Sequence, residues 1–373
     1  MTASRDRTID ILKGIGIIMM TLGHCHAPCR FTFSLFHVAI FFIASGFFMR
    51  ESNSDDLRST AKYTFKKFRS LWLPYFLCIA ILSATHNLQL KIGLLTTDQR
   101  VLELTGGHYD YEMLSDTWSI SQIFNSIIRG FFFGGGVSFA GNIWFLRVLL
   151  MISVLYCGIS FLIKSVVHTA VSGKVLIVQS IVSVVFLICG FCLQKKGLTL
   201  YGIGTTLSCY ILYHAGSLIG RYAGKIGIKI ISVLGVISIV LLTILYIRRI
   251  GVMETGLVNN AYLDPVFLVI TSLAGWFAVY LASCLLNKFK GINLFLSECG
   301  KHSLIIMIMH PICFKAVNMI QVRAYGLPHY ALAAYPVIYS DHLWWLLCTI
   351  VGVLIPLGTG LLWAKIHSIH LSH

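Results

Sequence analysis

Residues 9–24 read IDILKGIGIIMMTLGH, a largely apolar stretch close to the length of a membrane-spanning helix. A bilayer core about 30 Å thick is crossed by a helix of roughly 20 apolar residues. Comparable stretches recur along the chain, at 32–49, 70–85, 143–163, 175–194, 199–219, 228–247, 262–286, 303–320 and 343–363. The pattern predicts an all-α polytopic membrane protein of about ten transmembrane helices, built as a single membrane domain over residues 1–373.

The composition agrees with this class. Hydrophobic residues make up 57% of the 373 residues and charged residues 12%, whereas about 25% of residues are charged in an ordinary soluble domain. A soluble globular enzyme is therefore excluded, and membrane lipids are expected to surround the chain. The formal net charge is +15. In so apolar a chain, this excess of positive charge is explained by the basic residues that set the orientation of the helices in the membrane. No nucleic acid partner is therefore expected.

The basic residues are distributed unevenly between alternate loops. With the N-terminus inside, 17 Lys and Arg residues fall on the inner side and 10 on the outer side, while Lys13 and Arg147 lie within spans. Cytoplasmic loops of membrane proteins carry the excess of positive charge. Both termini are therefore expected to be cytoplasmic.

One long excursion, residues 86–142, leaves the membrane on the predicted outer side. Within it, apolar side chains recur at helical spacing from Trp118 to Phe131, with polar side chains such as Gln122 and Arg129 between them. This spacing is typical of an amphipathic helix. We expect that helix to lie in the membrane interface or to re-enter the bilayer.

Four polar side chains share one face of the first span. At 100° per residue, the stripe is about 80° wide, and it contains Asp10, Lys13, Thr21 and His24. Ionisable groups inside a membrane mark functional sites by default. Lys13 and His24 lie about 16.5 Å apart along the axis, so we expect them to face one cavity at different depths, with Asp10 neutralising Lys13. The alternative is that Lys13 snorkels and His24 sits among the headgroups.

Other histidines fall in the apolar spans. His37 and Ser45 lie in the second span, which a short turn joins to the first, so His37 and His24 are expected near the outer end of one pocket. His214 and His310 lie in the sixth and ninth spans. Buried histidines also ligate haem or metals. No pair of histidines at i and i+4 occurs in these spans, so a bound metal is not expected.

A basic cluster of Lys66, Lys67 and Arg69 precedes Pro74 at the start of the third span. On the predicted inner side, such cations suit the recognition of an anionic, phosphate-bearing ligand. The glycines of the chain show neither a Walker pattern nor a dinucleotide fingerprint, so a nucleotide loop is not expected.

These residues resemble the motifs of the acyltransferase-3 family of integral membrane O-acyltransferases, including its sugar O-acetylase branch. The first span is similar to the family signature of a basic residue, ten residues and a histidine, here Lys13 and His24. The other similar motifs are Phe36-His37, Phe41-Phe42 and Ser45-Gly46, Arg69 before Leu73-Pro74-Tyr75, Trp144-Phe145-Leu146, and Ser303-Leu304 followed by His310. The chain departs from the family at Lys66, where the family often has Arg, and at Ala39, where it often has Pro.

The resemblance implies an enzyme of the bacterial cytoplasmic membrane that moves an acetyl group to a hydroxyl of a saccharide, as a cell-surface or lipid-linked glycan. Acetyl-CoA would enter from the cytoplasm as co-substrate, with no permanently bound cofactor. His24 is the implied general base, and His37 is a second catalytic residue. The implied donor-binding residues are Lys13, Lys66, Lys67 and Arg69, and the implied pocket residues are Asp10, Thr21, Ser45, Trp144 and His310.

A transporter or flippase of a lipid-linked sugar is the alternative, since ten spans and buried charge suit it equally well. The sequence shows no corresponding interrupted helices in two halves, which usually indicate the inverted repeats of transporters. An enzyme is therefore the favoured interpretation.

Overall fold

The computed structural model describes residues 7–28, 30–104, 113–134, 136–167, 172–198, 200–225, 227–251 and 256–370. It is about 80% helical, and the described residues contain no strand. The chain divides into two compact units. Unit 1 comprises Met1–Arg30, Phe76–Ile143 and Lys290–His373, and unit 2 comprises Phe31–Tyr75 and Trp144–Phe289.

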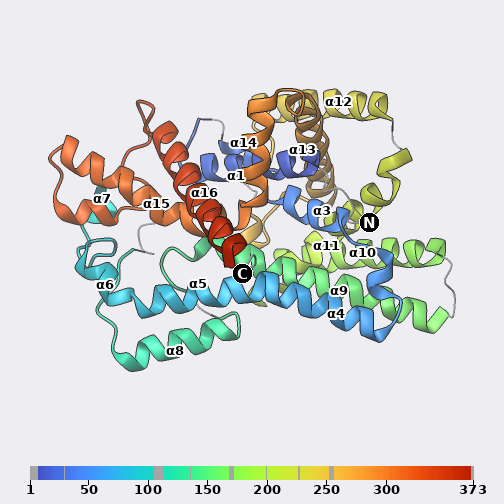
Figure 1. Ribbon diagram of the computed structural model, residues 1–373, viewed down its shortest axis with the longest axis horizontal. Helices are drawn as coiled ribbons and strands as arrows, with labels where there is room; N and C mark the ends of the chain where they lie inside the picture. Colours follow the sequence, from blue (N-terminus) through green and yellow to red (C-terminus); the bar gives the residue numbers. More distant parts are fainter. Residues whose placement is uncertain are drawn as a thin grey trace. The chain divides into compact units, whose positions relative to one another are not determined.

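The helices of each unit are shown in Figure 1. Unit 1 contains α1 (Arg7–His24), α6 (His86–Lys91), α7 (Val101–Leu104), α8 (Ile120–Phe131), α14 (Lys290–Lys301), α15 (Ser303–Ala324) and α16 (Trp344–His370). Unit 2 contains α2 (Arg30–Ser34), α3 (Ala39–Phe47), α4 (Leu57–Lys67), α9 (Trp144–Val167), α10 (Ser172–Lys195), α11 (Ile203–Tyr222), α12 (Ile228–Arg248) and α13 (Pro265–Leu286). Helix α5 (Leu73–Ala84) begins in unit 2 and ends in unit 1.

Eight helical stretches of the described chain are long and apolar enough to cross a membrane. They are Arg30–Phe47, Leu57–Ala84, Gly141–Val166, Gly173–Lys195, Ile228–Arg248, Pro265–Leu286, Ser303–Ala324 and Trp344–Ile366. The predicted spans 9–24 and 199–219 are also largely helical, as α1 and α11, but neither belongs to this set. Helix α1 carries Arg7, Asp10 and Lys13, and α11 is rich in Ser, Thr and Tyr. The prediction of about ten spans is therefore supported in part.

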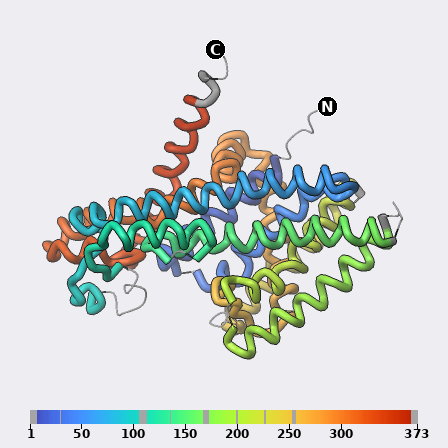
Figure 2. The backbone as a smooth tube through the Cα atoms, turned by 90° about the horizontal axis from the view of Figure 1, so that it is seen from below, coloured from blue at the N-terminus to red at the C-terminus, as the bar shows by residue number. Residues whose placement is uncertain are grey.

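The third span is longer than the sequence predicts. Instead of a loop before residue 70, α4, a π-turn (Phe68–Trp72) and α5 form one continuous helix (Figure 2). Asp56 begins it, because its carboxylate accepts a hydrogen bond of 2.7 Å from the backbone N–H of Ser59 in a capping box. Pro74 would disrupt a regular α-helical turn, and we attribute the continuation of the helix to the wider π-turn just before it.

Close helix pairs in both units depend on glycine. A Cβ added to Gly14 of α1 would overlap the carbonyl oxygen of Leu296 in α14, and one on Gly300 of α14 would overlap that of Asp10. In unit 2, α3 and α11 approach in the same way at Gly46 and Gly216. Small residues at these crossings let two backbones meet, as is common in membrane helix packing.

The excursion of unit 1 contains the predicted helix. Helix α8 lies beside α5, where the Ser126 and Ser83 hydroxyls are 2.9 Å apart (Figure 1). Its exposed side chains include Ile120, Phe124 and Ile128, which share one face because they are four residues apart. The contact of this apolar face with a membrane stays a prediction. Residues 105–112 and 135 of the excursion lie outside the described residues.

A histidine at the start of the excursion contacts residues near its middle. The buried ring of His86 stacks on Trp118 at 3.7 Å between centroids, and its Nε2 lies 3.1 Å from the carbonyl oxygen of Asp116. Burial lowers the pKa of His86 below its ordinary value, because it disfavours the charged imidazolium.

A buried lysine anchors the segment that follows α15. The Lys315 ammonium donates to the carbonyl oxygens of Leu332, Ala333 and Ala334 at 3.3, 2.8 and 2.5 Å. Asn318, one turn further on, donates to the Ala334 carbonyl at 2.7 Å. We call residues 328–340 the anchored segment. Its Val337 packs in a core cluster with Cys25, Phe314 and Cys348, so it lies beside the end of α1.

Candidate functional site

The structure brings His24 and His310 together in unit 1. His24 is the last residue of α1, and His310 lies within α15. Their ring centroids are 5.2 Å apart and their planes are tilted by 43°. His310 is fully buried, with its Nδ1 2.9 Å from the carbonyl oxygen of Ile306, whereas His24 is partly exposed. His24 is therefore the more accessible of the two rings.

The inner part of the α1 stripe is an ion pair. The Asp10 carboxylate and the Lys13 ammonium are 3.1 Å apart, as their spacing predicts, with Asp10 buried and Lys13 partly exposed. The buried hydroxyl of Thr21, on the same face, donates to the Ile17 carbonyl one turn earlier, at 3.0 Å. A short hydroxyl side chain readily bonds its own helix in this way, which uses the hydroxyl proton, and the place of Thr21 in a substrate pocket stays a prediction.

Three further predicted site residues lie in unit 2. His37 occupies the turn between α2 and α3, and its Nδ1 donates to the Phe33 carbonyl at 2.6 Å. This bond leaves the lone pair of the neutral ring on Nε2. Ser45 is partly buried on α3, and Trp144 begins α9, with its ring edge-on to Phe145 at 6.3 Å. The structure describes each unit separately, so their placement beside His24 stays a prediction.

The predicted donor-binding cations of unit 2 lie on the long helix Leu57–Ala84. Lys66 and Arg69 are exposed. The Lys67 ammonium instead lies over the Tyr63 ring, 5.4 Å from its centroid, in a cation–π contact. Lys66 and Arg69 are therefore the more available partners for an anion.

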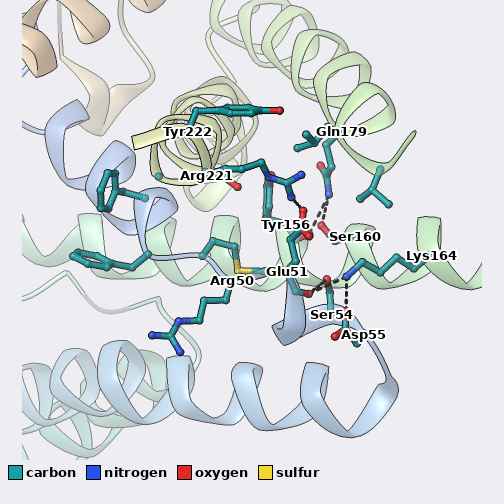
Figure 3. A pocket seen from close by; sticks show the side chains of 17 residues that line it. Arg50, Glu51, Ser54, Asp55, Tyr156, Ser160, Lys164, Gln179, Arg221 and Tyr222 are labelled. Carbon is teal, nitrogen blue, oxygen red and sulfur yellow. Dashed lines mark hydrogen bonds and ion pairs between the residues drawn. The ribbon is translucent and has the colours of Figure 1, made fainter. Parts of the chain in front are cut away.

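Unit 2 also contains a pocket of about 940 Å³ that the sequence does not predict (Figure 3). Two ion pairs line it, between Arg221 and Glu51 and between Lys164 and Asp55, the second at 2.7 Å. From the sequence, Arg221 and Lys164 enter only the count of basic residues on the predicted inner side. Their pairing depends on α9, α11 and the residues after α3, which no local pattern brings together.

His214, one of the histidines in the predicted spans, belongs to a polar network beside this pocket. Its Nδ1 lies 3.0 Å from the Tyr156 hydroxyl, and its Nε2 lies 2.9 Å from the Ser180 hydroxyl. Both ring nitrogens are thus engaged within the protein. In the described part of the chain, no three His, Cys, Asp or Glu side chains are grouped as a metal site.

Comparison with known proteins gives the class of reaction. A family model described as an acyltransferase domain matches residues 6–361. The chain belongs to the acyltransferase-3 family. No curated protein and no solved structure matches this acyltransferase-3 chain. The family and the long apolar helices together make the protein a multi-pass membrane acyltransferase, which confirms the prediction of the family.

Proposed function

We propose that this acyltransferase moves an acetyl group from acetyl-CoA to a hydroxyl of a saccharide, with His24 as general base. The family match across residues 6–361 carries the class of reaction. The role of His24 is supported by its partial exposure at the end of a polar helix face and by the second imidazole beside it. An unperturbed imidazole titrates near neutral pH, as a general base requires.

The proposed reaction is a direct transfer. His24 removes the proton of the acceptor hydroxyl as the oxygen attacks the carbonyl carbon of the thioester. The new C–O bond forms, the C–S bond breaks, and CoA leaves as a thiolate that takes up the proton. The products are the O-acetyl ester and free CoA.

The donor would bind through its phosphates. Lys66 and Arg69 are exposed cations on one helix, and Arg in particular forms paired hydrogen bonds with phosphate oxygens. Lys67 and Lys13 are proposed as further donor contacts, with Asp10 holding Lys13 in place at 3.1 Å. We propose that the donor enters from the cytoplasm, because the predicted topology puts the basic cluster on that side.

The acceptor is proposed to be a cell-surface or lipid-linked glycan in a bacterial cytoplasmic membrane. His37, with its lone pair on Nε2, is proposed to contact the acceptor, together with Ser45 and the aromatic ring of Trp144. Mass spectrometry of surface and lipid-linked glycans from cells with and without the protein tests this assignment. Loss of an O-acetyl group in the deletion strain is expected, and glycans identical in the two strains would contradict it.

Replacement of His24 tests the base. His24→Ala should lower the rate of acetyl transfer at least about a hundredfold, the usual contribution of general base catalysis, while membrane insertion is retained. His26→Asn is the matched control, because His26 lies beyond the end of α1 at a positive φ of 57°, which Asn tolerates. Purified protein with labelled acetyl-CoA provides the assay. Full activity of His24→Ala would refute the role of His24.

Neutralisation of the basic cluster tests the donor site. Lys66→Gln with Arg69→Gln should weaken acetyl-CoA binding by more than about tenfold, since each phosphate contact is a charge-assisted bond. Arg58→Gln with Lys62→Gln on the same helix is the control, because it removes the same charge from positions outside the proposed site. Equal loss of affinity in both double variants would show a general effect of charge and would remove the donor assignment.

A further inference from the structure

The buried His310 has one ring nitrogen that holds a proton and one that is basic. Its Nδ1 lies 2.9 Å from the carbonyl oxygen of Ile306. A carbonyl oxygen only accepts hydrogen bonds, so Nδ1 is the donor and carries the proton of the neutral ring. The lone pair of His310 is therefore on Nε2.

This Nε2 has no hydrogen-bond partner among the described residues. His310 is 0% exposed, so bulk water does not provide one either. Buried polar atoms are hydrogen-bonded in the great majority of cases, and an exception in a native protein calls for an explanation such as a catalytic role. An orphaned basic nitrogen beside a proposed general base is such a case.

His24 is the neighbouring side chain that can donate a hydrogen bond to this nitrogen. The two ring centroids are 5.2 Å apart, while the Phe314 ring meets His310 edge to face at 5.4 Å and offers no proton. Hydrogen bonds of a catalytic site are often long before substrate binds and tighten in the complex. The tilt of 43° between the two planes and the centroid distance of 5.2 Å put the His24 imidazole, which carries an N–H donor when neutral, next to the His310 ring.

We infer that His310 is a positioning residue that accepts a hydrogen bond from His24 during acyl transfer. The inference rests on the proposed role of His24 as base. One nitrogen of His24 takes the proton of the acceptor hydroxyl, while the N–H on its other nitrogen donates to Nε2 of His310. The oxygen bonds to the thioester carbon, the C–S bond breaks, and the proton passes from His24 to the CoA thiolate. His310 thereby fixes which nitrogen of His24 is basic and stabilises the imidazolium, as a third group does in a catalytic triad.

His310→Phe is the first test, because it keeps a ring in the core and removes both nitrogens. The kcat of acetyl transfer should fall by about a hundredfold, with the Kd for acetyl-CoA changed less than about twofold and thermal unfolding retained. His302→Phe in the same unit is the control and should keep kcat within about threefold of the wild type. A His310→Phe enzyme with wild-type kcat would overturn the inference.

A second test separates basicity from packing and also applies if His310→Phe fails to fold. His310→Ala is assayed with imidazole or with pyrazole, a ring of the same size that is a far weaker base. Recovery of kcat with imidazole alone supports the inference, and equal recovery with both rings, or with neither, overturns it.

The His24→Ala variant distinguishes the two hypotheses. Activity retained in His24→Ala would refute the proposed base and the inference with it. Activity lost in His24→Ala but kept in His310→Phe would refute the inference alone.

Discussion

Replacing Gly14 by alanine should push α1 and α14 apart. A Cβ at this position would overlap the carbonyl oxygen of Leu296 and lie 2.9 Å from its carbonyl carbon. Non-bonded carbon atoms approach each other to about 3.5 Å, so the two backbones must separate by at least about 0.6 Å. His24 lies ten residues further along the same helix and would be displaced together with it.

The expected cost combines two opposing effects. Overpacking in a tight interior costs about 1–3 kcal/mol, and alanine regains up to about 1 kcal/mol over glycine within a helix. We expect Gly14→Ala to lower the free energy of unfolding by up to about 2 kcal/mol. Equilibrium unfolding of the detergent-solubilised protein, followed by tryptophan fluorescence, measures it.

Gly158→Ala in α9 is the matched control. A Cβ at Gly158 would meet nothing within 4 Å, so only the gain in helix propensity remains. The control should be as stable as the wild type or slightly more stable. If Gly14→Ala and Gly158→Ala change the unfolding free energy equally, the close approach of α1 and α14 is not what requires glycine.

Three further perturbations test other parts of unit 1. Asp10→Asn removes the carboxylate beside the Lys13 ammonium and should cost about 3 kcal/mol, part of which the added Lys13→Met change should restore in the same unfolding assay. Burial lowers the pKa of His86 below its ordinary value of about 6.5, so the unfolded form takes up a proton first as the pH falls. The stability that His86 contributes is therefore full above this pH and declines below it, and hydrogen exchange in residues 113–119 should show that loss, but not in His86→Phe. Lys315→Met should release the anchored segment and speed the alkylation of the buried Cys348 by a water-soluble maleimide, measured by peptide mass spectrometry; an unchanged rate would show that the ammonium does not hold the segment.

The fold was predictable where the sequence of a single helix shows a clear apolar pattern. Long apolar runs located the spans, and helical spacing located α8. The continuous helix Leu57–Ala84 was not predictable, because proline usually ends a helix and Pro74 lies within this one. The π-turn that lets the helix continue has no sequence signature of its own. Helix α14 lies between two predicted spans and is not itself predicted, since Lys290, Glu298 and Lys301 interrupt its apolar pattern. It forms because Gly300 lets it pack directly on α1.

The candidate site was predictable only within a helix. Spacing along α1 predicts the ion pair of Asp10 with Lys13, since residues three apart share a face. Helical spacing also puts Thr21 on that face, yet it cannot show that the hydroxyl bonds to Ile17. The contact of His24 with His310 joins helices from opposite ends of the chain, and it depends on tertiary packing that no local pattern contains.

The anchored segment is held through its backbone, which a side-chain substitution within the segment does not remove. Lys315 binds the carbonyl oxygens of Leu332, Ala333 and Ala334, and every amino acid has a backbone carbonyl. The hydrogen bonds of the anchor therefore do not depend on which side chains this stretch carries, whereas the packing of its buried side chains does. The position of this stretch beside the end of α1 is thus specified by polar side chains of α15, Lys315 and Asn318, and not by a polar side chain of its own.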